Sequence, residues 1–159
     1  MVMQDRRSDT VDRLMHATPA RVYRALIDPA LVACWIAPQG AGATVDRFDP
    51  TPGGNLQITL VFDRPTGGKT TDKTDIVKGR FLELHTDRRV QQAFEFESAD
   101  PAFAGTMTMT WSLTPATGGT SVKVVADNVP PGISEADHRA GMSSSLANLA
   151  DLLERTGKG

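Results

Sequence analysis

The chain is short of several features that would point directly to a function. It has one cysteine, Cys34, which excludes an internal disulfide and a metal site built from several cysteines. Its longest apolar run, residues 31–37, is much shorter than the roughly 20 residues that a membrane-spanning helix needs. The first ten residues, MVMQDRRSDT, contain no apolar core, so we expect no secretory signal.

An excess of basic residues is also missing. The 17 Lys and Arg residues are balanced by 19 Asp and Glu residues, which gives a formal net charge of -2. A protein that binds nucleic acid or anionic lipid would carry a basic surface. The length of 159 residues suits one domain with a sizeable core. We therefore expect a single cytoplasmic domain over residues 1–159, without a nucleic-acid or membrane partner and without a cofactor.

The segment ATPARVYRALIDPALVACWIAP is the most informative part of the chain. It predicts two short consecutive helices, which begin at Pro19 and Pro29. Thr18 and Asp28 come directly before the two prolines, and their side-chain oxygens are suited to cap the free amides of a first helical turn. Apolar residues recur at helical spacing in both helices. Paired short helices followed by many strands are an uncommon order of elements, so few folds are compatible with this sequence.

The middle of the chain predicts about six strands. In Thr106–Thr114, large apolar residues alternate strictly with Thr and Ser, which is typical of a strand with one buried face. The turns between these strands are short, for example at Gly67-Gly68, so the sheet is expected to be antiparallel. Further strands are predicted before and after the helices, at 10–16, 56–62, 76–84, around Phe94 and Phe96, and at 120–127.

A long helix is predicted at the end of the sequence. Ser134 is suited to cap it, Asp137 completes a pair that resembles a capping box, and Gly157 fits its C-terminal end. One face of this helix is mainly apolar, so the helix is expected to lie across the sheet. That face consists of His138, Met142, Leu146, Leu149 and Leu153.

This order of elements resembles the START-like, birch-pollen-allergen-like helix-grip fold of the SRPBCC superfamily. A closer resemblance is to homologues of the activator of the heat-shock protein ninety ATPase. It is carried by the two-helix segment and by four further segments in the family's order: DPTPGGNLQITLVF, GRFLELHTDRRVQQAFEFES, DPAFAGTMTMTWSLTPATGGTSV and PPGISEADHRAGMSSSLANLADLLE. The resemblance implies an α+β fold, in which a curved antiparallel sheet of about six or seven strands wraps around the long C-terminal helix.

The same resemblance implies a cavity between the sheet and the long helix. A packed core contains the same kinds of apolar side chains, so a filled interior is the alternative. Methionines would suit a pocket that adapts to different shapes, because their side chains repack readily. Carried onto this chain, the apolar lining of the cavity is Trp35, Leu60, Phe62, Phe81, Phe94, Phe96, Met107, Met109, Trp111, Met142 and Leu146.

A few polar residues are candidates for orienting a ligand in this apolar wall. Gln92 shares strand parity with Phe94 and Phe96, and Arg80 or Asp75 would lie at the rim. His138 precedes Met142 by one helical turn and is the candidate catalytic residue, because the pKa of histidine lies near neutrality. The alternative for His138 is a partly exposed residue near a helix N-terminus.

Other patterns in the sequence carry no chemistry. Gly67-Gly68-Lys69-Thr70 ends like a phosphate-binding loop, but Asp63 stands at the first glycine position and no helix follows, so we expect a hairpin turn. The sequence Gly141-Met142-Ser143 resembles a nucleophile elbow but falls within the long helix.

The remaining candidate residues also favour simple structural roles. The three histidines lie far apart without metal-ligand spacing, so no metal site is predicted. Asp72 and Asp75 could hold a cation weakly, but a solvated loop is favoured. Cys34 is expected to be a small core residue beside Trp35. No Ser-His-Asp, Cys-His or paired-carboxylate pattern is present.

Three functions fit these observations. The first is a protein that binds a small hydrophobic molecule between helix and sheet. The second is an enzyme of the cyclase or hydratase kind that uses the same cavity, with His138 as proton donor. The third is a co-chaperone-like module that stimulates the ATPase of a chaperone partner. An exposed strand edge would also allow a homodimer.

Overall fold

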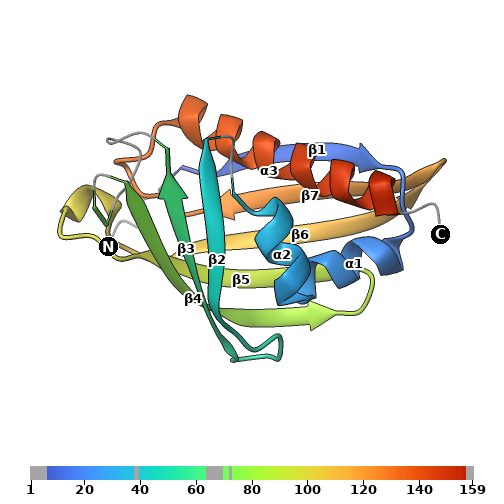
Figure 1. Ribbon diagram of the computed structural model, residues 1–159, viewed down its shortest axis with the longest axis horizontal. Coiled ribbons are helices and arrows are strands. Elements are labelled where there is room, and N and C mark those ends of the chain that lie inside the picture. The colour runs from blue at the N-terminus through green and yellow to red at the C-terminus, as the bar shows by residue number, and fades with distance from the viewer. Residues whose placement is uncertain (1–6, 38–39, 64–69, 72, 157–159) are drawn as a thin grey trace, which may run out of the picture.

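The strands form one curved antiparallel sheet in which the first strand lies beside the last (Figure 1). The computed structural model describes residues 7–37, 40–63, 70–71 and 73–156. The sheet has the order β1-β7-β6-β5-β4-β3-β2. This arrangement confirms the predicted α+β class. The strands are β1 (Asp9–Met15), β2 (Ala41–Phe48), β3 (Asn55–Phe62), β4 (Thr74–His85), β5 (Arg89–Phe96), β6 (Met107–Ala116) and β7 (Gly119–Asp127).

The two short helices follow β1 as predicted, at α1 (Pro19–Ile27) and α2 (Pro29–Trp35). The Thr18 hydroxyl accepts a hydrogen bond from the Arg21 amide at 3.2 Å. The Asp28 carboxylate accepts one from the Ala30 amide at 3.0 Å. Both predicted caps are therefore confirmed, and each proline stands where no helical N–H partner is needed.

The long helix α3 (Glu135–Thr156) is also confirmed. The Ser134 hydroxyl accepts a hydrogen bond from the Asp137 amide at 3.1 Å, which is the predicted cap. Four members of the predicted apolar face, from Met142 to Leu153, are buried. Figure 1 shows α3 running along β1, which it contacts. The predicted helix end at Gly157 and the hairpin turn at 67–69 lie outside the described residues.

Three local expectations were wrong or incomplete. Cys34 is exposed, with its thiol directed at the Ala30 carbonyl oxygen at 3.3 Å, so it is not a core residue. Asp75 is 1% exposed and belongs to β4, so it is not in a solvated loop, while Asp72 lies outside the described residues. The strand β2 had not been assigned to particular residues.

One glycine lets an aromatic ring approach the sheet closely. Gly79 on β4 pairs with Phe94 on β5. A Cβ atom at this position would lie 2.9 Å from Phe94 Cδ1 and would also clash with the Ala93 carbonyl oxygen. Glycine therefore allows the Phe94 ring to lie against β4, on the face that borders the site described below.

No helix among the described residues is both long and apolar enough to cross a membrane.

Candidate ligand cavity

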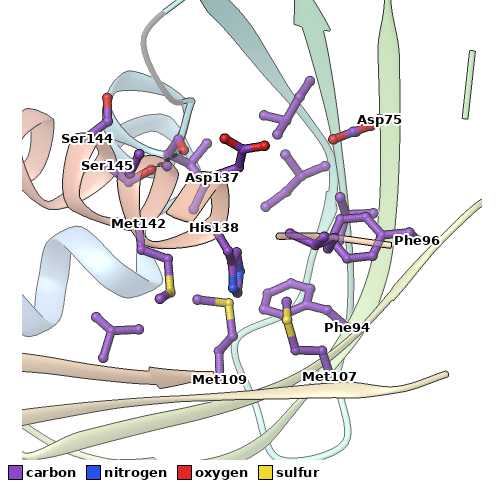
Figure 2. A pocket seen from close by; sticks show the side chains of 18 of the residues that line it. Asp75, Phe94, Phe96, Met107, Met109, Asp137, His138, Met142, Ser144 and Ser145 are labelled. Carbon is purple, nitrogen blue, oxygen red and sulfur yellow. Dashed lines mark hydrogen bonds between the residues drawn. The ribbon is translucent and has the colours of Figure 1, made fainter. Parts of the chain in front are cut away.

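A cavity of about 630 Å³ lies between the N-terminal half of α3 and the inner faces of the central strands (Figure 2). Its walls come mainly from β3, β4, β5 and β6 on one side and from residues 137–145 of α3 on the other. Sites for small molecules are commonly about 300–1,000 Å³, with mostly apolar walls and a few polar groups. The size and lining of this cavity fall in that class.

Most of the predicted pocket residues line this cavity. The two aromatic residues of β5 stand opposite the helix, and Met142 projects from α3 (Figure 2). Whether these side chains contact a ligand stays a prediction. The predicted residues found in the lining are Leu60, Phe62, Phe94, Phe96, Met107, Met109, Trp111, His138 and Met142.

Four predicted residues lie outside the lining of the large cavity. Phe81 is fully buried and packs edge-on against Phe48, with ring centroids 5.2 Å apart. Leu146 is 1% exposed and belongs to the core. Trp35 and Gln92 border a separate void of about 30 Å³. These side chains fill space behind the cavity wall.

One tryptophan of that wall, Trp111, packs against a second tryptophan behind it. Trp111 lines both the cavity and the small void, and its ring meets that of Trp35 edge-on with centroids 5.2 Å apart. Trp111 Nε1 donates to Gln92 Oε1 at 3.1 Å. Gln92 is thus buried and directed inward, as predicted, but its oxygen is held by Trp111.

The polar lining is concentrated on β4 and α3. Asp75 lines the cavity from β4, whereas Arg80, the other rim candidate, is exposed and is not in the lining. Asp137, His138, Ser144 and Ser145 contribute polar groups from α3. The reason for the difference on β4 is strand parity, because positions 75 and 80 project to opposite faces.

His138 is held by a buried carboxylate that the sequence analysis missed. Its Nδ1 lies 2.7 Å from Asp9 Oδ2. The Asp9 side chain is fully buried, and the His138 side chain is 13% exposed. Arg7 Nε donates to Asp9 Oδ1 at 2.8 Å, and Arg7 also donates to the Ile133 carbonyl oxygen at 2.6 Å. The result is a chain of contacts from Arg7 through Asp9 to His138.

The electrostatics of Asp9 fix the proton on His138. Burial raises the pKa of Asp9, but the hydrogen bonds and charges of Arg7 and His138 outweigh it and bring this pKa below its ordinary value. Asp9 is therefore ionised near neutral pH and can only accept hydrogen bonds. It follows that His138 Nδ1 carries a proton directed at Asp9.

Asp9 adds to the predicted site, because β1 and α3 bring it together with His138. His138 is partly exposed and lies in the first turns of α3, as its structural alternative predicted, and it also borders the cavity. Its catalytic role stays a prediction. Among the described residues, no group of three or more His, Cys, Asp or Glu side chains is placed to hold a metal ion.

A curved antiparallel sheet that encloses a cavity against a long C-terminal helix defines the helix-grip class of α+β proteins. Within that class, the model of the family described as "Activator of Hsp90 ATPase homolog 1-like protein" matches residues 16–154. The chain belongs to this family. The resemblance found in the sequence is thereby confirmed.

Several solved structures share the fold. Protein CV1439 from Chromobacterium violaceum is 28% identical, with a TM-score of 0.83 over 92% of this chain and 96% of that one. An AHSA1-like protein from Aeromonas hydrophila is 19% identical, with a TM-score of 0.72 over 95% and 94%. DynU16, a protein of the dynemicin biosynthetic locus, is 23% identical, with a TM-score of 0.66 over 95% of this chain and 48% of that one. No curated protein matches significantly.

Proposed function

We propose that this protein binds a small hydrophobic molecule in the cavity between α3 and the sheet. The observation that carries the proposal is a cavity of about 630 Å³ whose walls are mainly Met, Phe, Ile and Val side chains. An apolar cavity leaves side chains without contact partners on one side. A ligand of matching shape would restore those contacts, and each 100 Å² of apolar ligand surface removed from water would contribute about 2.5 kcal/mol.

Native mass spectrometry of the protein as purified, followed by solvent extraction, tests this proposal. We expect a bound apolar molecule that survives desalting, or else a rise in melting temperature with some member of a panel of lipids and aromatic compounds. A protein that carries nothing and whose melting temperature no compound of the panel shifts would contradict the proposal.

A pair of variants at Gly141 ties the result to this cavity. Gly141 lines it, and an added Cβ atom would meet no heavy atom within 4 Å. Gly141→Phe places a ring in this open space and should reduce binding. Gly141→Ala makes the same backbone change with only a methyl group and is the matched control. Equal binding by both variants would place the ligand elsewhere.

A second candidate function is an enzyme of the cyclase or hydratase kind. The contact between His138 and Asp9 favours it, because a carboxylate that holds Nδ1–H fixes the orientation and tautomer of a general acid or base. The printed description of DynU16 places that protein in a biosynthetic locus. If the extracted molecule or a close analogue is converted by the protein, His138→Ala should abolish turnover. Turnover that persists in this variant would remove His138 from the mechanism.

The description of the family gives a third candidate, activation of the Hsp90 ATPase. For this chain, activation of a chaperone ATPase is a hypothesis. Adding the purified protein to a chaperone ATPase assay tests it. An unchanged ATPase rate would remove it.

A further inference from the structure

Half of the methionines of the chain line the cavity. The sequence has six, and three of them, Met107, Met109 and Met142, belong to the lining. Met107 and Met109 project from the inner face of β6, because positions two apart on a strand share a face. Met142 projects from α3 on the opposite wall. Three thioether sulfur atoms from two elements are therefore directed into one mainly apolar space.

A histidine accompanies the three thioethers. His138 precedes Met142 by one turn of α3, so both residues lie on the same face of the helix. Figure 2 shows both side chains projecting from α3 into the part of the cavity that Met109 enters from β6. The cavity thus collects soft sulfur donors and an imidazole ring in one region.

The buried contact between His138 and Asp9 is a second, independent indication of a ligand at this place. Asp9 Oδ2 lies 2.7 Å from His138 Nδ1, and the Asp9 side chain is fully buried. With the proton held on Nδ1, the lone pair of the neutral ring is on Nε2. Histidines that bind metals almost always donate their other N–H group to a carboxylate, a backbone carbonyl or water, which fixes the ring and makes the ligating nitrogen more basic.

The kinds of donor atom determine which metal would bind. Thioether sulfur is a soft ligand that selects Cu(I), and imidazole nitrogen also suits copper. Zinc instead prefers thiolate, imidazole and carboxylate ligands. Among the described residues, no three His, Cys, Asp or Glu side chains are grouped for such an ion. The donor set of the cavity therefore favours a soft monovalent ion.

We propose that the cavity binds Cu(I) through the sulfur atoms of Met107, Met109 and Met142 and through Nε2 of His138. The sequence predicted no metal site, because that expectation rested on the spacing of the histidines and the thioethers come from distant segments. This inference goes beyond the proposed function and does not depend on it. An apolar ligand and the ion would occupy the same cavity, but either could bind without the other.

Competition with the chromophoric chelator bicinchoninate, without oxygen and with ascorbate present, measures Cu(I) binding. The exposed thiol of Cys34 would itself bind Cu(I), so every variant is made in a Cys34→Ser background. We expect one Cu(I) ion per chain in this background. Met109→Leu and Met142→Leu should each lower the Cu(I) affinity by about tenfold or more, because leucine keeps a similar apolar volume without the sulfur atom.

A third methionine variant is the matched control. Met15 is fully buried in the core and is not part of the cavity lining, so Met15→Leu should leave the Cu(I) affinity unchanged. Equal affinities of the Met15, Met109 and Met142 variants would overturn the inference. An absence of Cu(I) binding by the Cys34→Ser protein would also overturn it. Neither result would touch the proposed function, which the extraction of an apolar molecule tests separately.

The nitrogen ligand is tested by proton–nitrogen NMR of the histidine rings. Addition of Ag(I), a redox-stable analogue of Cu(I), should shift the Nε2 resonance of His138. The resonances of His16 and His85, which are both exposed and outside the cavity lining, should stay unchanged. A His138 Nε2 resonance that does not shift with Ag(I) would overturn the assigned set of ligands.

Discussion

At the scale of single residues, Asp9 combines two roles. It lies fully buried between the guanidinium of Arg7 and the imidazole of His138, at 2.8 Å and 2.7 Å. The same contacts that orient His138 at the cavity also join β1 to the start of α3. A charge in such a place is tolerated only with its partners present, because the desolvation of an unpaired ion is costly.

Replacing Asp9 with Asn should therefore destabilise the protein strongly. The variant keeps the shape of the side chain but removes the anion that pairs with Arg7. Its amide N–H group would also face a donor, either Arg7 or His138 Nδ1. We expect a loss of about 3 kcal/mol in the free energy of unfolding, measured by urea denaturation. Asp12→Asn on the exposed part of the same strand should change this free energy by less than about 0.5 kcal/mol. Similar losses in the two variants would contradict the assigned role of Asp9.

The pH dependence of stability should report the same carboxylate. The pKa of Asp9 is lower in the folded protein than in the unfolded chain, so the unfolded chain binds more protons in acid. The stabilisation from ionised Asp9 is then complete above the unfolded pKa of about 3.9 and is lost as the pH falls through the folded pKa. Urea denaturation between about pH 6 and about pH 2 should show a steeper loss in the natural protein than in Asp9→Asn. Parallel profiles would show that Asp9 does not contribute.

At the scale of elements, two side chains of α3 fix the end of α2 beside the cavity. Asn148 Nδ2 donates to the Ala37 carbonyl oxygen at 2.8 Å, and Ser145 Oγ donates to the Ile36 carbonyl oxygen at 2.8 Å. Ile36 and Ser145 both belong to the cavity lining. These bonds satisfy carbonyl groups at the C-terminal end of α2, where no helical partner follows.

Asn148→Ala should loosen that helix end without unfolding the molecule. We expect a loss of about 1 kcal/mol in the free energy of unfolding and faster hydrogen exchange for the amide of Ile36, which bonds the Val32 carbonyl oxygen. Ser143→Ala, at an exposed position on the same helix, is the control. Unchanged exchange at Ile36 in Asn148→Ala would show that the bond to α2 is unimportant.

Elements with strong local signals could be predicted from the sequence. The capped prolines defined α1 and α2, and strict alternation defined β6, because these signals depend only on neighbouring residues. Strand β2 lacked such a signal, since its apolar residues are small or widely spaced and a bulge between Val45 and Arg47 breaks the alternation. Cys34 was misplaced because adjacent residues of a helix point in different directions, so a buried Trp35 says nothing about its neighbour.

The contact between Asp9 and His138 could not be predicted for a related reason, whereas Asp75 was predicted at the rim but not as a buried residue. Asp9 and His138 are separated by 129 residues, and only the pairing of the first strand with the last brings them together. Asp75 stands in a polar stretch that resembles a loop, although the strand begins at Thr74. The apolar wall of the cavity was easier to predict from the sequence. Once a sheet is assumed, strand parity indicates which residues share a face.

At the scale of the whole molecule, the sheet depends on residues from both ends of the described chain. Strand β1 pairs with β7 along its whole length, from Asp9 opposite Ala126 to Met15 opposite Thr120, and it also contacts α3. Deletion of residues 1–15 should abolish the cooperative unfolding transition, because it exposes the β7 edge and removes the partner of His138. Circular dichroism during urea titration measures this. A truncated protein that unfolds cooperatively at the same urea concentration would contradict the prediction.

The edge-on packing of the two tryptophans also determines where the fluorescence of the protein originates. Trp35 and Trp111 are the two tryptophans of the chain, and their ring centroids are 5.2 Å apart. Trp111 also lines the cavity. All of the tryptophan fluorescence of the protein therefore originates at one point beside the cavity. A guest molecule that displaces solvent there should shift the emission maximum or quench it, so occupancy can be followed without any attached dye.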